Sequence, residues 1–323
     1  MFAAGSVALM FAAAWSMTVG AANIDLQIIY AALFAYDPEA TSHHLVREVR
    51  LPRVLLGAMV GASFAVSGAV MQGMTRNPLA SPSIMGLNAG AGLFLAVTFV
   101  LIPGIGYTGL IIASLIGASV GAALVFGIGT LSRGGLTPVK LALAGATVAA
   151  LLTSLTTGFL IYFERARDVL FYTAGGVQGA RWEQVLLMAP WLAVGLVVAV
   201  LFARHLTVLS LGEEIATGLG QRAGVTRVAL TAVVLMLAGA AVAVAGGIGF
   251  VGLVVPHLVR FLVGLDYRRI VPASAVVGAL LVVLADLGAK SVRPPFETPI
   301  GVLTALIGIP FFLYLARRDR RGL

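Results

Sequence analysis

Apolar segments recur along the whole chain, and most of them are long enough to cross a lipid bilayer. Hydrophobic residues make up 60% of the 323 residues and charged residues 11%, whereas soluble domains average roughly 45–50% apolar and about 25% charged residues. Because polar side chains are too few to cover a water-soluble globule, much of the apolar surface must face lipid. The composition therefore predicts an all-α integral membrane protein.

A membrane-crossing helix needs about 20 predominantly apolar residues. Runs of this kind predict one transmembrane domain over residues 1–323, a bundle of about ten helices. The predicted spans are residues 3–22, 51–75, 89–103, 107–131, 138–163, 185–203, 228–248, 250–264, 270–287 and 299–316. Glycines four residues apart, at 57/61, 86/90 and 117/121, are the small-residue pattern that lets helices approach closely in lipid.

The first run has two interpretations. Residues 19–22 resemble a signal-peptide cleavage site, but no Lys or Arg precedes them and Arg47 is the first basic residue, which favours a retained membrane helix. With the C-terminus inside, the inner gaps hold thirteen basic residues and the outer gaps eight. Because basic residues accumulate on the cytoplasmic side, we expect both termini in the cytoplasm.

Several classes of function are excluded or disfavoured. The net charge of +8 is dispersed between apolar runs and forms no stripe for nucleic acid. The chain has no cysteine, and its four histidines show no metal-ligand spacing. Neither of its two lysines follows a glycine, so no P-loop is present. We therefore expect neither an enzyme nor a chain that binds a cofactor itself; any ATP would be hydrolysed by another chain.

Four stretches contain motifs that are informative beyond their hydropathy. Arg50 and Arg53 flank Pro52 at the outer mouth of the second span, either as exposed forks for carboxylates or as interfacial side chains that snorkel. Residues 72–90 contain two turn-forming prolines, which indicates a cytoplasmic loop or the lining of a pathway.

The third stretch, Leu211–Gly220, has two glutamates at its start and a glycine at its end, as in a short helix. It lies in the longest cytoplasmic gap, about residues 204–227, and looks like a docking surface. The fourth stretch, residues 246–269, includes His257 beside Pro256, for which a structural role is favoured over a ligand role.

At these stretches the chain resembles the permease subunits of ATP-binding-cassette (ABC) importers for ferric siderophores, haem and cobalamin. The motifs run in order from about residue 45 to the C-terminus. They are Arg50-Leu51-Pro52-Arg53, Gly68 with Gln72, Asn77-Pro78-Leu79-Ala80, residues 141–145 (LALAG), Leu211-Gly212-Glu213 with Ala216 and Leu219-Gly220, residues 249–253 (GFVGL), Pro256-His257 with Arg260, Asp286, Pro299-Ile300-Gly301 and residues 308–311 (GIPF).

The resemblance implies a bacterial inner-membrane protein of ten helices with several partners. These are a second permease subunit (identical or paralogous), two cytoplasmic ATPase subunits and an extracytoplasmic substrate-binding protein. It assigns three functional groups of residues. The groups are Arg50, Arg53, Lys290 and the nearby Arg293 for docking the binding protein; Asn77, Leu79, Thr137 and Pro138 for an inner gate; and Leu211, Gly212, Glu213, Ala216, Leu219 and Gly220 for coupling to the ATPases.

The mechanism implied is a change of access driven by ATP binding elsewhere, with a ferric siderophore as the favoured cargo and haem or cobalamin left open. A proton- or sodium-driven transporter is the rival interpretation, but such proteins place ionisable residues near the membrane midplane. Glu164, Asp168, Glu183 and Asp286 all fall at the ends of predicted spans, which disfavours that rival. A membrane-embedded enzyme is disfavoured further, because no catalytic constellation occurs.

Overall fold

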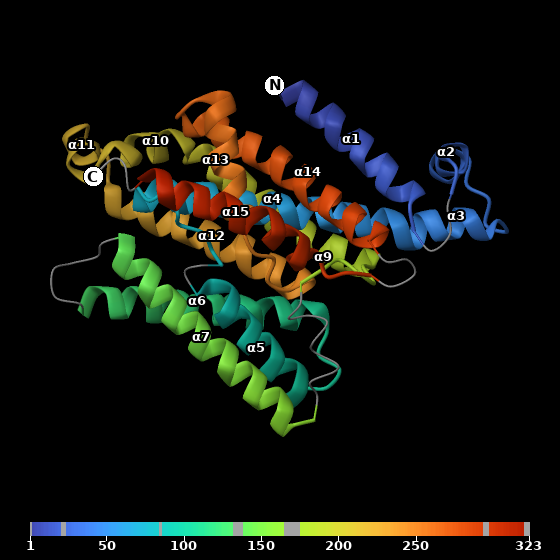
Figure 1. Cartoon of the computed structure of the whole chain (residues 1–323), viewed down its shortest axis with the longest axis horizontal. Helices are drawn as coiled ribbons and strands as arrows, with labels where there is room; N and C mark the ends of the chain where they lie inside the picture. The colour runs from blue at the N-terminus through green and yellow to red at the C-terminus, as the bar shows by residue number, and fades with distance from the viewer. Residues whose placement is uncertain are drawn as a thin grey trace.

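The computed structural model describes residues 2–20, 24–83, 86–131, 138–164, 175–292 and 297–319, and this part of the chain contains helices and no strand (Figure 1). The helices are α1 (Phe2–Thr18), α2 (Leu26–Phe34), α3 (Thr41–Leu45), a π-helical turn η1 (Val46–Arg50), α4 (Leu51–Thr75), α5 (Leu87–Leu101), α6 (Tyr107–Leu131), α7 (Pro138–Tyr162), α9 (Trp182–Leu201), α10 (Ala203–Leu211), α11 (Glu213–Gly218), α12 (Ala223–Ala245), α13 (Val251–Val263), α14 (Tyr267–Ser291) and α15 (Ile300–Asp319). The all-α prediction is confirmed for these residues.

Helix length and composition separate two groups of apolar helices. Within the described ranges, six are long and apolar enough to cross a membrane: Thr41–Thr75, Tyr107–Ile128, Leu143–Tyr162, Trp182–Leu201, Ala223–Ala245 and Tyr267–Ser291. Four shorter apolar helices lie at Phe2–Thr18, Leu87–Leu101, Val251–Val263 and Ile300–Leu313. Each corresponds to one of the predicted runs.

The boundaries agree best where polar residues flank a run. The predictions 51–75 and 107–131 coincide with α4 and α6, whereas α14 extends beyond the predicted 270–287 at both ends. The extra residues of α14 include Arg268 and Lys290. Hydropathy excludes such charged residues, but their ion pairs allow the helix to include them. Helix α2 was not predicted, because its apolar stretch is only nine residues long. Helices α3 and α10 and the turn η1 were not predicted either, because they are short and contain polar residues such as His44, Arg47 and His205.

Helix α4 is the centre of the bundle. The span that contains it is 83% buried, against 28% for α9, and it packs against α14, α12 and α13. Glycine makes this packing possible. A Cβ added at Gly61 would collide with the backbone carbonyl of Gly278 in α14, and one at Gly68 with that of Gly252 in α13. Helices meet backbone to backbone here because no side chain separates them.

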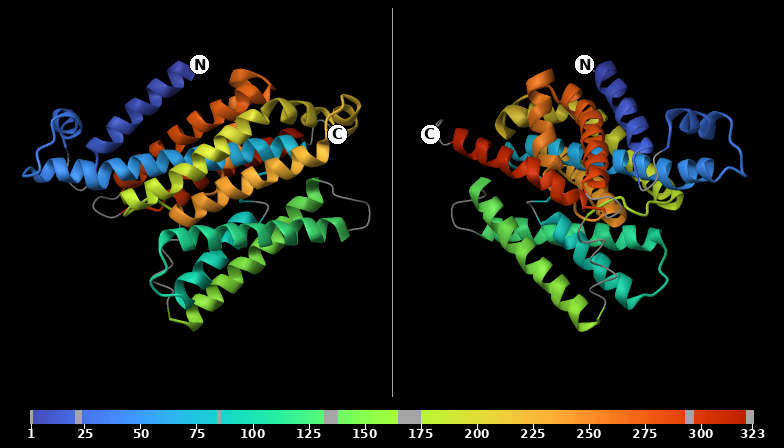
Figure 2. Two further views of the ribbon diagram at one scale, coloured as in Figure 1. Left: turned by 180° about the vertical axis from the view of Figure 1, so that it is seen from behind. Right: turned by 45° about the vertical axis from the view of Figure 1, so that its right-hand side comes forward.

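Helices α5, α6 and α7 form a second group, drawn in teal to green in Figures 1 and 2. Gly90 of α5 lies against the carbonyl of Gly117 in α6, and Gly121 lies against the carbonyl of Gly86. The glycine pairs 86/90 and 117/121 therefore form one interlocking contact, as the small-residue pattern predicted. Gly57 makes only an ordinary contact, 3.7 Å to the side chain of Val177.

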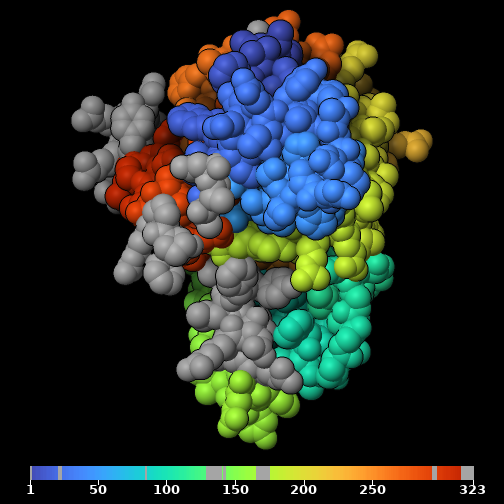
Figure 3. Space-filling view, turned by 90° about the vertical axis from the view of Figure 1, so that its right-hand side faces the viewer, coloured from blue at the N-terminus to red at the C-terminus, as the bar shows by residue number. Residues whose placement is uncertain are grey.

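The two ends of the bundle differ. Helices α2 and α3 lie at one end, and Figure 3 looks onto it, with residues 24–50 forming the broad blue surface. Helices α10 and α11 lie at the opposite end, where the C-terminus is also found (Figures 1 and 2). The predicted outer and inner functional residues are thus separated by the length of the bundle.

Candidate functional site

Four charged side chains form a cluster at the end of the bundle that carries α2 and α3. The guanidinium of Arg53 donates to Asp286 through Nη2 (2.8 Å) and Nε (3.0 Å), and to Oε1 of Glu297 through Nη1 (2.6 Å). Lys290 Nζ lies 2.7 Å from the other oxygen of Asp286. Asp286 is 2% exposed. A buried carboxylate needs such partners, because leaving it unpaired away from water is strongly unfavourable.

The same end of the bundle attaches α1. Lys290 donates to the hydroxyl of Ser16 at 3.2 Å, and the guanidinium of Arg50 donates to the carbonyl of Met17. These contacts join the last turn of α1 to Arg50, the final residue of η1 directly before α4, and to Lys290 of α14. The cluster therefore joins three helices that are far apart in the sequence.

The structure brings three predicted docking residues together but corrects their environment. Arg50, Arg53 and Lys290 were expected at the surface, yet they are 7%, 9% and 7% exposed. The reason is that the end of α1 and the carboxylates of Asp286 and Glu297 pack against them, which a hydropathy profile cannot show. Arg293 lies outside the described residues. Their role in docking stays a prediction.

At the other end, residues 76–80 form a tight turn after α4. Arg76 ends the helix in the left-handed region (φ 51°). Oδ1 of Asn77 accepts a hydrogen bond from the backbone N–H of Leu79 at 2.9 Å, and the Asn77 carbonyl accepts one from the N–H of Ala80 at 3.1 Å. Asn77 is 8% exposed, whereas Arg76 is exposed and Leu79 half-buried, so this part of the predicted inner gate is a defined turn that buries its asparagine.

The second half of the predicted gate is less fully described. Pro138 begins α7, where its fixed φ suits the first helical turn. Its side chain and the whole of Thr137 lie outside the described residues. Contact between the two halves of the gate stays a prediction.

Behind the turn, a polar network ties α4 to α13 and α14. Arg260 donates to Oε1 of Gln72 at 2.6 Å and to the hydroxyl of Tyr267 at 3.3 Å. Gln72 Nε2 in turn donates to the carbonyl of Gly252 at 3.2 Å. In the sequence Gln72 and Arg260 stand out only as motif residues, because they are 188 positions apart.

Asp266 caps the start of α14 and connects it to α10. Hydrogen bonds from the side chain and backbone N–H of Arg268 lower the pKa of Asp266 from 3.8 to about 2. The hydroxyl of Thr207 in α10 lies 3.2 Å from Oδ1 of Asp266 and accepts from the N–H of Tyr267 at 3.0 Å. Thr207 therefore joins α10 to the first turn of α14 through two hydrogen bonds.

The predicted short helix of the coupling segment is present. Helix α10 ends at Leu211, and α11 spans Glu213–Gly218. Gly212 interrupts the helix between them with a φ of 139°. Gly220 follows with φ 79°, a conformation that favours glycine. An exposed ion pair of 2.8 Å joins Glu213 to Arg227 at the start of α12. The segment is thus a separate helical element, set off by two glycines.

The side chains of α10 and α11 divide into two sets. Ala216 is fully buried and packs with Leu209 and Ala223. Leu211, Ile215 and Leu219 are 62%, 49% and 70% exposed. Leu211 ends α10, Ile215 lies in α11 and Leu219 directly follows it, and exposed leucine and isoleucine side chains in so short a segment suit a surface that another protein covers.

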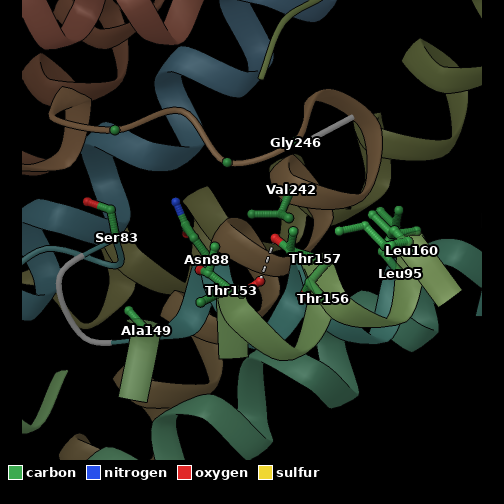
Figure 4. Close-up of a pocket in the computed structure, with 15 residues that line it drawn as sticks. Ser83, Asn88, Leu95, Ala149, Thr153, Thr156, Thr157, Leu160, Val242 and Gly246 are labelled. Carbon is green, nitrogen blue, oxygen red and sulfur yellow. Dashed lines mark hydrogen bonds between the residues drawn. The ribbon is translucent and has the colours of Figure 1, made fainter. Parts of the chain in front are cut away.

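A cavity of about 520 Å³ lies between α5, α7 and the segment that follows α12 (Figure 4). Thr153, Thr156 and Thr157 of α7 line one side, and Asn88 of α5 another. Oδ1 of Asn88 is buried without a hydrogen-bond partner among the described residues. None of the described lining residues is ionisable. The threonines at positions i, i+3 and i+4 share one helix face, a signal that could have identified this lining from the sequence.

His257 takes the structural role that the sequence favoured. Its ring lies edge to face with Phe261 and with Phe311 of α15, at centroid distances of 5.2 and 5.4 Å. It is packed among aromatic rings rather than placed in a cluster of metal ligands. Such a cluster, of three or more His, Asp or Glu side chains, is absent from the part of the chain that the structure describes.

Comparison with known proteins now identifies the family. Residues 8–318 match the FecCD transport family. The chain belongs to this family. It is therefore a membrane transport permease, as its motifs predicted.

Among the relatives, the iron(3+)-hydroxamate import system permease protein FhuB of Bacillus subtilis is 52% identical over 320 residues, which cover 99% of this chain and 83% of FhuB. The Fe(3+)-citrate import system permease protein YfmD of the same organism is 45% identical, covering 99% of this chain and 95% of YfmD. A solved structure of a metal-chelate type ABC transporter in an inward-facing conformation matches with a TM-score of 0.81 at 29% identity, covering 98% of both chains.

Proposed function

We propose that this chain is the permease subunit of an ABC importer that carries a ferric chelate, in the first instance a ferric siderophore, inward across the bacterial inner membrane. The observation that carries the proposal is 52% identity to an iron(3+)-hydroxamate permease along almost the whole chain. Relatives named for cobalamin and hemin are 42% and 36% identical, so ferric hydroxamate and ferric citrate are favoured over these cargoes.

The chemistry of the cavity supports a chelate rather than a bare ion. Free ferric iron in a protein site takes oxygen or nitrogen ligands such as carboxylates and imidazoles. The described lining offers hydroxyl groups and one amide and no ionisable side chain. Hydroxyl and amide groups can meet the oxygen-rich surface of a chelate without removing its metal. Selectivity would then come from the extracytoplasmic binding protein.

The proposed topology has ten spans, with both termini in the cytoplasm. The six long and four shorter apolar helices supply ten candidates. The distribution of basic residues favours α10, α11 and the C-terminus on the cytoplasmic side. That placement puts the exposed Leu211, Ile215 and Leu219 where the two ATPase subunits would dock, and puts the Arg53 cluster where the binding protein would dock.

The transport step would be alternating access between outward-open and inward-open arrangements of two permease subunits, identical or paralogous. ATP binding can shift such an equilibrium only by favouring one arrangement. The route available in this chain runs from α11 to α10, and from Thr207 of α10 to Asp266 and Tyr267 at the start of α14. Helix α14 then reaches the outer cluster at Asp286 and Lys290.

Growth on defined iron sources tests the cargo. In the bacterium that carries this gene, deletion should abolish growth on ferric hydroxamate or ferric citrate as sole iron source, and the gene restored on a plasmid should rescue it. Haem as iron source and uptake of cobalamin serve as comparisons. If deletion instead abolishes only growth on haem, or only uptake of cobalamin, that compound is the cargo and the proposal is contradicted.

A further inference from the structure

The guanidinium of Arg53 is almost fully engaged within its own chain. Its Nε and Nη2 atoms face Asp286, which is 2% exposed. Its Nη1 atom donates to Glu297. The side chain of Arg53 is 10% exposed, whereas that of Glu297 is 35% exposed. Of the two carboxylates that Arg53 binds, the one within reach of an outside partner is therefore Glu297, on Nη1.

The cluster is electrically balanced as it stands. Two cations, Arg53 and Lys290, face two carboxylates, Asp286 and Glu297. A carboxylate arriving from outside would meet a neutral group rather than a positive one. To reach Nη1 of Arg53 it would have to take the position of Glu297.

We propose that Glu297 is an internal competitor of the binding protein, which occupies Arg53 until an acidic side chain of that protein replaces it. This inference rests on the proposed function, because it takes the docking partner to be an extracytoplasmic binding protein. Docking becomes an exchange of carboxylates on one guanidinium. Asp286 stays on Nε and Nη2 throughout and keeps Arg53 oriented.

Such an exchange would make docking readily reversible. The incoming carboxylate gains one charged hydrogen bond while the chain loses another, so the net gain is small. Released Glu297 moves toward solvent, which its exposure already allows. Arg53 lies at the start of α4 and Glu297 precedes α15. The exchange therefore also breaks the ion pair that joins the segment before α15 to α4.

The test measures the affinity of the cognate binding protein for the assembled transporter in lipid nanodiscs, comparing Glu297→Gln with wild type. Glu297→Gln leaves a cation uncompensated at the accessible side, so docking should tighten about three- to tenfold. Glu183→Gln is the matched control, because Glu183 is exposed beside Trp182, which bonds to the carbonyl of Arg47 at the same end of the bundle. It removes the same charge without touching Arg53.

A second comparison separates competition for Arg53 from general electrostatics. In an Arg53→Gln background, Glu297→Gln should no longer tighten docking. Equal tightening by Glu183→Gln, tightening that persists without Arg53, or weaker docking of Glu297→Gln would each overturn the inference. Failure of the proposed function would look different, because wild type itself would then not bind the binding protein.

Discussion

Replacing Ala216 by tryptophan tests whether α11 couples ATP hydrolysis by the ATPase subunits to transport through the permease. Ala216 has no exposed surface and packs with Leu209 of α10 and Ala223 of α12. An indole cannot fit there, and overpacking a close-packed site costs about 1–3 kcal/mol. Helix α11 is only six residues long and is set off by Gly212. The helix should therefore move away from α10 to relieve the strain while the bundle stays folded.

The size of the effect follows from that cost. At 1.4 kcal/mol per factor of ten, a cost of about 1–3 kcal/mol lowers the equilibrium constant for the seated position of α11 about 5- to 150-fold. Substrate-stimulated ATP hydrolysis and uptake should fall by up to this factor. The amount of permease in the membrane and the affinity for the binding protein should not change, because their residues lie at the other end of the bundle.

The assay compares Ala216→Trp with Ala216→Ser, a change of nearly the same size, in reconstituted transporter. The serine variant should couple ATP hydrolysis to uptake as wild type does. If the tryptophan variant assembles with its ATPases and transports at the wild-type rate, α11 is only a connector. If it fails to reach the membrane, the strain reaches the bundle and the reasoning about local relief is wrong.

Three further predictions follow from single features. Gly90→Val should cost about 1–3 kcal/mol, because the added atoms meet the backbone of Gly117, whereas the Cβ of Gly92→Val in the same helix has open space. Thermal unfolding in detergent compares the two variants, and equal melting temperatures would contradict the close packing of α5 on α6. Because the folded-state pKa of Asp266 is lowered from 3.8 to about 2, its stabilising effect should be present above pH 3.8 and be lost as the pH falls through about 2. The melting difference between wild type and Asp266→Asn should therefore stay constant from neutral pH to about pH 4, and a difference that already vanishes between neutral pH and pH 4 would refute the assignment. Single cysteines at positions 135 and 179 of this cysteine-free chain should be labelled from opposite sides of the membrane, and labelling of both from one side would contradict the proposed topology.

The sequence predicted the helices better than it predicted their partners. The ends of α4 were correct because Arg50 and Pro52 mark its start and a polar turn from Arg76 marks its end. A change from polar to apolar residues at each end, together with these local signals, identifies such helix boundaries in the sequence. Hydropathy could not identify α2, whose nine residues lie between polar segments and which packs against α1, α3 and η1.

The outer cluster shows why site geometry escaped prediction. Arg53 was recognised by its motif, but its partner Asp286 is 233 positions away. A single sequence does not show which of its distant residues are in contact. Burial of Arg53 follows from that pairing, so the expectation of an exposed docking residue was wrong in the same step. In contrast, the short helix from Glu213 was predictable because its acidic start and glycine end are local signals.

The most direct test of the account is uptake of radiolabelled ferric hydroxamate into proteoliposomes that contain this permease, its ATPases and its binding protein. We expect uptake that requires ATP and every component, persists when ionophores collapse the proton and sodium gradients, and is lost in Ala216→Trp. Uptake that proceeds without ATP and stops when the ion gradients collapse would contradict the central claim.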